Sequence, residues 1–553
     1  MTDRLRIAFA QINQRVGDLE GNAAAILEMR RRAAGADLLM VPELQLIGYP
    51  PEDLVLKPEF VRRAMEWADK LVEATVEPGP ALLFGTVIGE ESANYNAFIL
   101  ADDGKLLART LKRELPNYGT FDEKRIFAPG PLPEPILFKG VKIGVPICED
   151  IWLDIVCAHL AEAGAEMLLV PNGSPYELDK DDIRYRLVRS RALQTGLPVA
   201  YLNRVGGQDE LVFDGSSFIV HPDGERVVQL CDWEEALLFT DWEQTSEGWR
   251  CTTRETHTLD AFPEDVYRAM VVGLRDYVRG NGFPGVILGL SGGIDSALSA
   301  AVAVDALGPD KVWCVMLPSK YTSEESLEDA RECARLLNCR HDVISIAPGV
   351  DALDGMIPDL KGLAAENVQA RLRMVTLMAL SNSGGQMLLT TGNKSEMSVG
   401  YATLYGDMAG GYSVLKDAYK TTVFALSRWR NRNRPEGALG PDGPVMPGNV
   451  ITKPPTAELR PGQKDEDSLP PYSVLDRILE GLVEREMSVR EVADATGEDI
   501  ALVADIESKL LKAEYKRRQA PPGVKIGSRN FGRDRRYPIS NFFHTGPRVK
   551  LPR

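Results

Sequence analysis

The feature that most constrains the fold is a short apolar run that leads into a glycine-rich turn and then a helical segment. It spans residues 286–296 and reads VILGLSGGIDS. A strand, a tight turn and a helix in this order are typical of a βαβ unit, whose strands lie in a parallel sheet. Three more apolar runs separated by helical stretches follow, at 312–317, 342–346 and 387–391. We therefore predict an α/β fold for this half of the chain, a doubly wound parallel sheet with a nucleotide site at its strand ends.

The turn itself has the residue types that a phosphate group requires. Gly292 and Gly293 let the backbone approach an anion, and the N–H groups at the start of the helix can hold it. No lysine follows the glycines, so the turn is not a Walker loop. Asp295 would repel phosphates unless a divalent cation lay between them, which implies Mg²⁺. A turn without a ligand would explain the glycines but not the whole hexapeptide that ends at Ser296.

The first half of the chain has a different pattern. Short β-rich runs alternate with helical stretches such as 22–34 and 183–195, which favours a layered α/β domain over a β sandwich. Periodicity is lost between 243 and 260. We therefore expect domains at 1–245 and 263–553 joined by a linker at 246–262, in keeping with a length that exceeds one hydrophobic core.

Two stretches of the second half differ from their surroundings. Residues 431–470 are crowded with Pro and Gly and are predicted to be loop. From residue 516 to the end, basic residues dominate, and we expect this C-terminal tail to meet anions or an acidic neighbour.

Composition excludes several classes of protein. A net charge of −16 disfavours indiscriminate binding to nucleic acid or to anionic membranes. The sequence has no apolar run of about 18 residues and its start lacks the apolar core of a signal peptide, so we expect a cytoplasmic protein. The seven cysteines are odd in number and contain no CxxC pair, which leaves a single nucleophilic cysteine as a possibility.

Three segments of the first half could together supply an amidase site. Glu43 follows one apolar run, Lys112 follows another, and Cys148 ends a third. Taken singly, each has an ordinary explanation as a solvated carboxylate, a surface lysine or a core thiol. Together they provide a general base, a positive charge for an oxyanion and a nucleophile, which amide hydrolysis needs.

In this order the three residues resemble the Glu-Lys-Cys triad of the nitrilase family. The resemblance implies an α-β-β-α sandwich, with Glu43 as base and then acid, Lys112 at the oxyanion and Cys148 as the atom that is acylated. It also implies glutamine-binding roles for Tyr118, Ser174 and Lys180. Glu123 either assists the triad or is a simple surface charge.

The second half resembles the ATP-pyrophosphatases through its SGGIDS loop, and NAD synthetases through the later segment Thr391-Gly-Asn-Lys-Ser-Glu396. The resemblance implies an ATP site formed by Gly289, Leu290, Ser291, Gly292, Gly293, Ile294, Asp295, Ser296, Thr391, Lys420 and Thr456. It implies a deamido-NAD site formed by Asn367, Glu396, Tyr401, Ala402, Thr403, Leu404 and Lys516. Mg²⁺ would be held by Asp295 and Glu396. For Lys516, a solvated helix face is an equally good reading.

The two halves in one chain resemble the family of glutamine-dependent NAD synthetases. The implied reaction adenylylates deamido-NAD with ATP and displaces AMP with ammonia from glutamine. The implied partners are these small molecules, with no nucleic acid or membrane, and a homodimer or higher homo-oligomer formed through the synthetase domain.

Two alternatives remain at this point. GMP and asparagine synthetases share the phosphate loop, but their glutaminases use a Cys-His-Glu set or an N-terminal cysteine, whereas Thr2 follows the first Met here. The other alternative is a nitrilase-type hydrolase whose second half only senses ATP. Release of pyrophosphate would decide whether this hydrolase alternative holds.

Overall fold

The computed structural model describes residues 3–90 and 93–546. By its internal contacts the chain divides into two compact units, Met1–Asp260 and Ala261–Arg553. The last seven residues of the predicted basic tail lie outside the described ranges. No helix within those ranges is long and apolar enough to cross a membrane.

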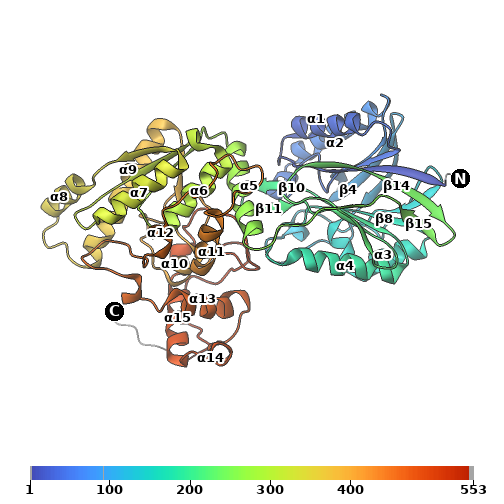
Figure 1. Ribbon diagram of the computed structural model, residues 1–553. Coiled ribbons are helices and arrows are strands. Elements are labelled where there is room, and N and C mark those ends of the chain that lie inside the picture. The colour runs from blue at the N-terminus through green and yellow to red at the C-terminus, as the bar shows by residue number, and fades with distance from the viewer. Residues whose placement is uncertain (1–2, 91–92, 547–553) are drawn as a thin grey trace. The chain divides into compact units, whose positions relative to one another are not determined.

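The first unit contains two seven-stranded sheets with helices on their outer faces (Figure 1). In spatial order, the strands of one sheet are β15 (Gly248–Cys251), β14 (Ala236–Thr245), β1 (Arg4–Gln11), β2 (Leu38–Met40), β3 (Ala81–Glu90), β4 (Ala93–Asp102) and β5 (Lys105–Leu111). Those of the other sheet are β16 (Glu255–Thr256), β13 (Arg226–Gln229), β12 (Phe218–Val220), β9 (Val199–Asn203), β8 (Met167–Asn172), β7 (Val141–Gly144) and β6 (Ile136–Phe138). A separate two-stranded ribbon joins β10 (Val205–Gln208) to β11 (Leu211–Asp214).

The helices of this unit cover both sheets. They are α1 (Leu19–Arg32), α2 (Pro58–Ala74), α3 (Asp154–Glu162) and α4 (Lys180–Thr195), with 3₁₀ turns η1 (Glu52–Leu56), η2 (Glu123–Arg125) and η3 (Cys148–Ile151). Strand β2 shows how the layers form, because its side chains alternate between faces. Leu38 and Met40 join the apolar core between the sheets, while Leu39 joins the core beneath α1 and α2. The predicted α-β-β-α sandwich is confirmed.

Strands β15 and β16 lie within residues 246–262, the stretch that lost periodicity in the sequence. β15 pairs antiparallel with β14 from Trp242↔Cys251 to Thr245↔Gly248. These residues therefore form regular structure in the first unit, although they lack a long alternating pattern.

The second unit is built on a five-stranded parallel sheet in the order β19 (Arg340–Val343), β18 (Val312–Met316), β17 (Val286–Gly289), β20 (Met387–Thr390), β21 (Tyr412–Ser413). Strands β17, β18 and β19 extend the sheet in one direction, and β20 then pairs with the opposite edge of β17. In doubly wound sheets, ligands usually bind at the C-terminal strand ends where the order reverses, which here are the ends of β17 and β20. The predicted doubly wound parallel sheet is confirmed.

Helices surround this sheet and form a further apolar cluster towards the C-terminus. Those of the sheet region are α5 (Glu264–Gly280), α6 (Ile294–Leu307), η4 (Pro309–Lys311), α7 (Glu324–Leu337), α8 (Ala347–Met356), α9 (Leu363–Gly384) and α11 (Lys420–Arg430). The later elements are α10 (Lys394–Val399), α12 (Gly448–Thr452), η5 (Asp465–Asp467), α13 (Tyr472–Leu479), the π-helical turn η6 (Glu480–Glu484), α14 (Val489–Thr496), α15 (Ile500–Lys512) and α16 (Glu514–Arg517). Residues 431–470 contain only α12 and η5 as regular structure, which agrees with the predicted loop.

Candidate active sites

The first site gathers charged side chains from three strand ends of the first unit. Lys112, just after β5, donates to Glu43 Oε1 at 2.7 Å and to both carboxylate oxygens of Glu123 at 2.9 Å. Lys112 and Glu43 are fully buried, and Glu123 and Cys148 nearly so. The charges of Glu43 and Lys112 both act on the thiol of Cys148, at the start of η3. The structure therefore brings together the three residues that the sequence selected, and Glu123 is part of the cluster rather than a surface charge.

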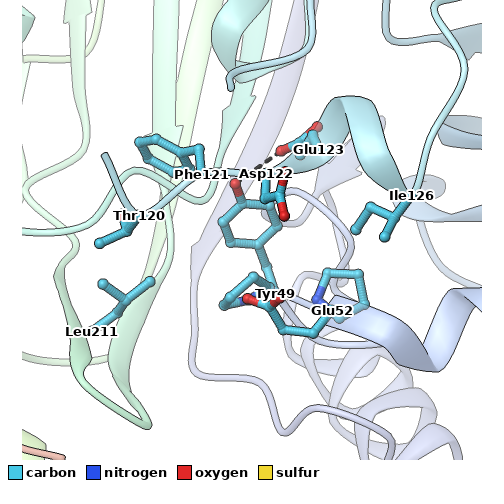
Figure 2. A pocket seen from close by; sticks show the side chains of 10 residues that line it. Tyr49, Glu52, Thr120, Phe121, Asp122, Glu123, Ile126 and Leu211 are labelled. Atoms are coloured by element: carbon cyan, nitrogen blue, oxygen red, sulfur yellow. Dashed lines mark hydrogen bonds between the residues drawn. The ribbon is translucent and has the colours of Figure 1, made fainter. Parts of the chain in front are cut away.

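The carboxylates of this cluster are held in place by other groups. Asn96 Nδ2 donates to Glu43 Oε1 at 2.8 Å, and the backbone N–H of Gly173 donates to Glu43 Oε2 at 2.9 Å. Tyr49 donates its hydroxyl to Glu123 at 2.8 Å and lines a small pocket with it (Figure 2). Sequence reasoning missed Asn96, Tyr49 and Gly173, which lie in segments without a local motif.

Burial and charge set the resting protonation of the cluster. Burial, followed by the charge of Glu43, raises the pKa of the Cys148 thiol, so the resting sulfur is a thiol. Burial alone would lower the pKa of Lys112, but Glu123 and Glu43 outweigh it and the net direction is upward, so the ammonium persists. A buried thiol beside a carboxylate needs that carboxylate as its base before it can attack.

A single buried carboxylate joins the lysine segment to the cysteine turn. Asp150 Oδ1 accepts the backbone N–H groups of Arg113 at 3.0 Å and Glu114 at 2.7 Å, and Oδ2 accepts that of Ile147 at 2.9 Å. These donors directly follow Lys112 and directly precede Cys148. Cys148 itself has φ 47°, a left-handed conformation that is costly for a residue with a side chain and is often found at functional sites.

Two of the three predicted glutamine-binding residues act on one carboxylate beside the nucleophile. Tyr118 donates its hydroxyl to Glu149 at 3.0 Å, and the charge of Lys180 lowers the pKa of the same Glu149, against a net rise caused by burial. The third, Ser174, has a different partner, since its Oγ accepts a hydrogen bond from Arg184 at 3.2 Å.

The second site lies at the C-terminal ends of β17 and β20, where the glycine-rich turn joins β17 to α6. Ser291 Oγ lies 3.1 Å from Ser296 Oγ and accepts the N–H of Gly293 at 3.2 Å, and Ser296 Oγ also donates to the carbonyl of Gly293 at 2.9 Å. Gly292 has φ +79°, and a Cβ there would lie 2.4 Å from the carbonyl oxygen of Ser326. Glycine is therefore required at 292 on two counts.

Beside this turn a buried lysine meets two carboxylates from different elements. Lys420 Nζ, at the start of α11, bonds to Asp295 Oδ2 and lies 3.3 Å from Glu396 Oε1. Asn393 Nδ2 donates to Asp295 Oδ1 at 2.9 Å, while Asn393 and Glu396 cap the start of α10. Burial raises the pKa of Glu396 to about 8, with Lys420 opposing and Asp295 adding to the rise. Thr391 lies directly after β20, on the same side of the sheet.

The residues predicted to hold deamido-NAD form a connected group in the same unit. Thr403 Oγ1 donates to Asn367 Oδ1 at 2.8 Å. Lys516 Nζ donates to the carbonyls of Gly400 at 2.8 Å and Ala402 at 2.7 Å, so it binds the 401–404 segment rather than lying on a solvated helix face. Thr456, which was predicted for the ATP site, donates its hydroxyl to the carbonyl of Gln463 at 2.6 Å.

Comparison with known proteins agrees with this division. Residues 6–250 match the carbon-nitrogen hydrolase family and residues 266–520 match the NAD synthase family. The chain is 50% identical to the glutamine-dependent NAD(+) synthetase of Rhodobacter capsulatus, over 98% of this chain and 99% of that protein. The chain belongs to the glutamine-dependent NAD(+) synthetases. Another member of the family, from Thermotoga maritima, is 42% identical over 98% of this chain and 99% of its own length.

Solved structures of the family extend the match to three dimensions. The glutamine-dependent NAD⁺ synthetase of Acinetobacter baumannii, solved with adenosine diphosphate, is 40% identical, with a TM-score of 0.76 over 97% of this chain and 99% of that chain. That of Cytophaga hutchinsonii is 23% identical with a TM-score of 0.80 over 97% of each chain, a similarity that concerns the fold alone.

Proposed function

We propose that this enzyme of the family makes NAD from deamido-NAD, ATP and glutamine, with one half-reaction in each unit. The observation that carries the proposal is that one chain has both a buried Cys148–Glu43–Lys112 cluster and a phosphate-type turn at the reversal point of a parallel sheet. Each cluster alone fits a wider range of reactions. Their combination fits an enzyme that releases ammonia and uses it to form an amide.

In the first unit, Glu43 takes the proton from Cys148 Sγ as the sulfur attacks the amide carbon of glutamine. The positive charge of Lys112 stabilises the oxyanion of the tetrahedral intermediate. Glu43 then gives the proton to the leaving nitrogen, which departs as ammonia and leaves a thioester on Cys148. Water activated by Glu43 hydrolyses the thioester to glutamate and restores the thiol.

Tyr118, Ser174 and Lys180 are proposed to hold the glutamine. Support comes from Glu149, the residue after the nucleophile, on which both Tyr118 and Lys180 act. A polar cluster one residue from Cys148 is suited to a substrate with an amino group and a carboxylate.

In the second unit, the turn from Gly289 to Ser296 is proposed to hold the phosphates of ATP with its N–H groups and hydroxyls. A carboxylate oxygen of deamido-NAD attacks the α-phosphorus and pyrophosphate leaves. Ammonia then attacks the acyl carbon and AMP leaves, which gives the amide of NAD. Thr391, Lys420 and Thr456 are assigned to the ATP side.

Deamido-NAD is assigned to the group around residues 401–404. The assigned side chains are Asn367, Glu396, Tyr401, Ala402, Thr403, Leu404 and Lys516. Their support is a continuous set of contacts from Asn367 through Thr403, and from Ala402 to Lys516.

Asp295 and Glu396 are proposed to hold Mg²⁺. Their carboxylate oxygens converge on a single point, now the ammonium of Lys420, and oxygen donors of this kind are the ones that Mg²⁺ prefers. The residues therefore fit the ion. When bound, it would offset the negative charge that accumulates on the phosphates of ATP.

The proposal is tested with the purified chain, ATP, Mg²⁺, deamido-NAD and glutamine. We expect NAD, AMP, pyrophosphate and glutamate in equal amounts. With deamido-NAD left out, no pyrophosphate should form, which controls for ATP hydrolysis. Glutamine hydrolysis without NAD or pyrophosphate would instead support a hydrolase whose second half only senses ATP.

We further propose that the second unit associates with itself to give a dimer or larger assembly. The support is the resemblance of this unit to NAD synthetases. Light scattering on the purified chain measures the mass directly, and a monomer at all concentrations would contradict the proposal.

A further inference from the structure

A buried ionic cluster lies next to the second site and has no role in the reaction as proposed. Its centre is Lys394, in the first turn of α10 between Asn393 and Glu396, and its side chain is completely buried. Lys394 Nζ lies 2.6 Å from Asp417 Oδ1, bonds to Glu484 Oε1, and donates to the carbonyl of Arg529 at 2.8 Å. These partners come from three regions of the unit, the loop before α11, the turn η6 and the C-terminal segment.

The two carboxylates also bind four consecutive residues of the C-terminal segment. Asp417 Oδ2 accepts the N–H groups of Ile526 and Gly527, both at 2.7 Å. Glu484 Oε2 accepts the hydroxyl of Ser528 at 2.8 Å and the N–H of Arg529 at 3.0 Å. Each carboxylate thus uses one oxygen for Lys394 and the other for the segment 526–529.

Removal of one member would leave charge buried without its counterpart. Two carboxylates and one ammonium carry a net charge of −1, and the polar hydrogens of 526–529 offset it. An unpaired buried charge is strongly destabilising, so the cluster fixes the positions of the segments that it joins.

It joins the segment 526–529 to the turn that presents Asn393 and Glu396. Asn393 contacts Asp295 and Glu396 contacts Lys420, so one residue on either side of Lys394 reaches the second site. A second buried contact holds the same turn, since Ser395 Oγ donates to Asp476 and accepts the N–H of Lys420 at 2.9 Å. A shift of Lys394 would therefore move Glu396 relative to Asp295.

We propose that Lys394, with Asp417 and Glu484, is a positioning cluster through which the C-terminal segment 526–529 sets the placement of Glu396 in the synthetase site. The inference rests on the proposed role of Glu396 in binding deamido-NAD and Mg²⁺. Lys394 acts through its neighbours and touches no reacting atom. The binding of deamido-NAD should depend on the cluster more strongly than the binding of ATP, whose phosphates are assigned to the turn after β17.

The test is steady-state kinetics of ammonia-driven NAD synthesis with Glu484→Gln. This variant keeps the shape of the side chain but places an amide group where two oxygens accepted hydrogen bonds. We expect the KM for deamido-NAD to rise about tenfold, while the KM for ATP changes less than about twofold. Glutamine hydrolysis should keep the rate of the parent.

Two more variants separate positioning from general destabilisation. Glu480→Gln is the matched control in the same turn, since its carboxylate is exposed and pairs with Arg485. It should leave all three measurements unchanged. Ser528→Ala removes one donor to Glu484 from the distant segment and should raise the KM for deamido-NAD in the same direction by a smaller factor.

A lower melting temperature of Glu484→Gln with an unchanged KM for deamido-NAD would overturn the inference and assign the cluster to stability alone. Equal rises in both KM values would overturn it as well. The parent enzyme is assayed first: absence of NAD synthesis by the parent refutes the proposed function, whereas synthesis by the parent with no effect of Glu484→Gln refutes only the positioning role.

Discussion

The two proposed sites share one arrangement, a buried lysine between two carboxylates, and differ in what surrounds it. Lys112 lies between Glu43 and Glu123. Asn96 and Gly173 also donate to Glu43, and Tyr49 donates to Glu123. Lys420 lies between Asp295 and Glu396. Asn393 is an additional partner of Asp295, which belongs to the glycine-rich turn. The first lysine is surrounded by the protein's own reactive groups, and the second adjoins a surface suited to a bound anion.

The difference teaches how each lysine can serve. In the first unit the charged groups are proposed to move protons between fixed atoms, so a rigid set of partners is an advantage. In the second unit the carboxylates are proposed to exchange their lysine contact for Mg²⁺ and substrate, so part of their bonding must be replaceable. Substitutions in the first site are therefore expected to lower turnover, and substitutions in the second site to weaken the binding of ligands.

The largest expected effect is loss of the activity of the first site with full retention of the activity of the second. Cys148→Ala removes the sulfur that is proposed to be acylated, and loss of a nucleophile costs about 10⁴-fold or more in turnover. We expect glutamine-driven NAD synthesis to fall by that factor while synthesis from ammonium salts stays at the level of the parent. Cys157→Ala, which removes another buried thiol of the first unit, is the control. Equal loss by both routes in Cys148→Ala would break the comparison.

The second-largest effect should lower both routes of NAD synthesis instead of one. Asp295→Asn removes a charge that faces Lys420 and is proposed to bind Mg²⁺, and loss of one such electrostatic contact costs about 10²- to 10³-fold. Glutamine-driven and ammonia-driven synthesis should fall together. Glutamine hydrolysis by itself is the internal control, and survival of ammonia-driven synthesis would contradict the assignment of Asp295.

A smaller effect tests whether the first site depends on rigid placement. Asp150→Asn leaves one backbone N–H facing an amide group, which loosens the connection between the Lys112 segment and Cys148. A displacement of about 1 Å can cost about 10²-fold, so glutamine hydrolysis should slow by up to that factor with a minor change in KM. The exposed Asp154→Asn is the matched control. An unchanged turnover number would show that the connection is not needed.

The smallest expected effect is a change of pH profile. Burial is the largest cause that raises the pKa of Glu123 to about 7, with Glu43 adding and Lys112 opposing. Below that pH Glu123 is protonated and its pairing with Lys112 weakens, so glutamine hydrolysis should fall as the pH drops through about 7. Glu123→Gln should lose this acid limb, and an identical limb in the variant would assign it to another group.

The same shift predicts a stability effect with a definite sign. The folded state holds a proton on Glu123 up to about pH 7, while the unfolded chain releases it near the ordinary value of 4.5. The stabilisation from this proton is therefore complete below about 4.5 and is lost as the pH rises through about 7.

Sequence reasoning was most successful where a function depends on one continuous segment. The turn from Ser291 to Ser296 could be found because its glycines, serines and aspartate are adjacent. The separate segments with Glu43, Lys112 and Cys148 were recognised through resemblance, and the structure brings them together.

Residues whose role depends on a distant partner could not be found in this way. Asn96, Tyr49 and Asp150 have no pattern of their own, because their partners lie in segments that only the folded sheets bring close. Glu484 and the segment 526–529 are another case, since more than forty positions separate them and the sequence indicated only that the tail was basic. Here the basic tail meets internal carboxylates, as Arg535 does with Glu514 at 3.0 Å.

The glycine at position 292 has a consequence for how sequences of this kind can diverge. The atom that would collide with a side chain there is the backbone carbonyl oxygen of Ser326, which every amino acid possesses. No second-site substitution at 326 can therefore make room, and a mutation at 292 has no simple genetic suppressor at its point of contact. Position 292 is therefore held to glycine by a backbone atom, whichever side chain stands at 326.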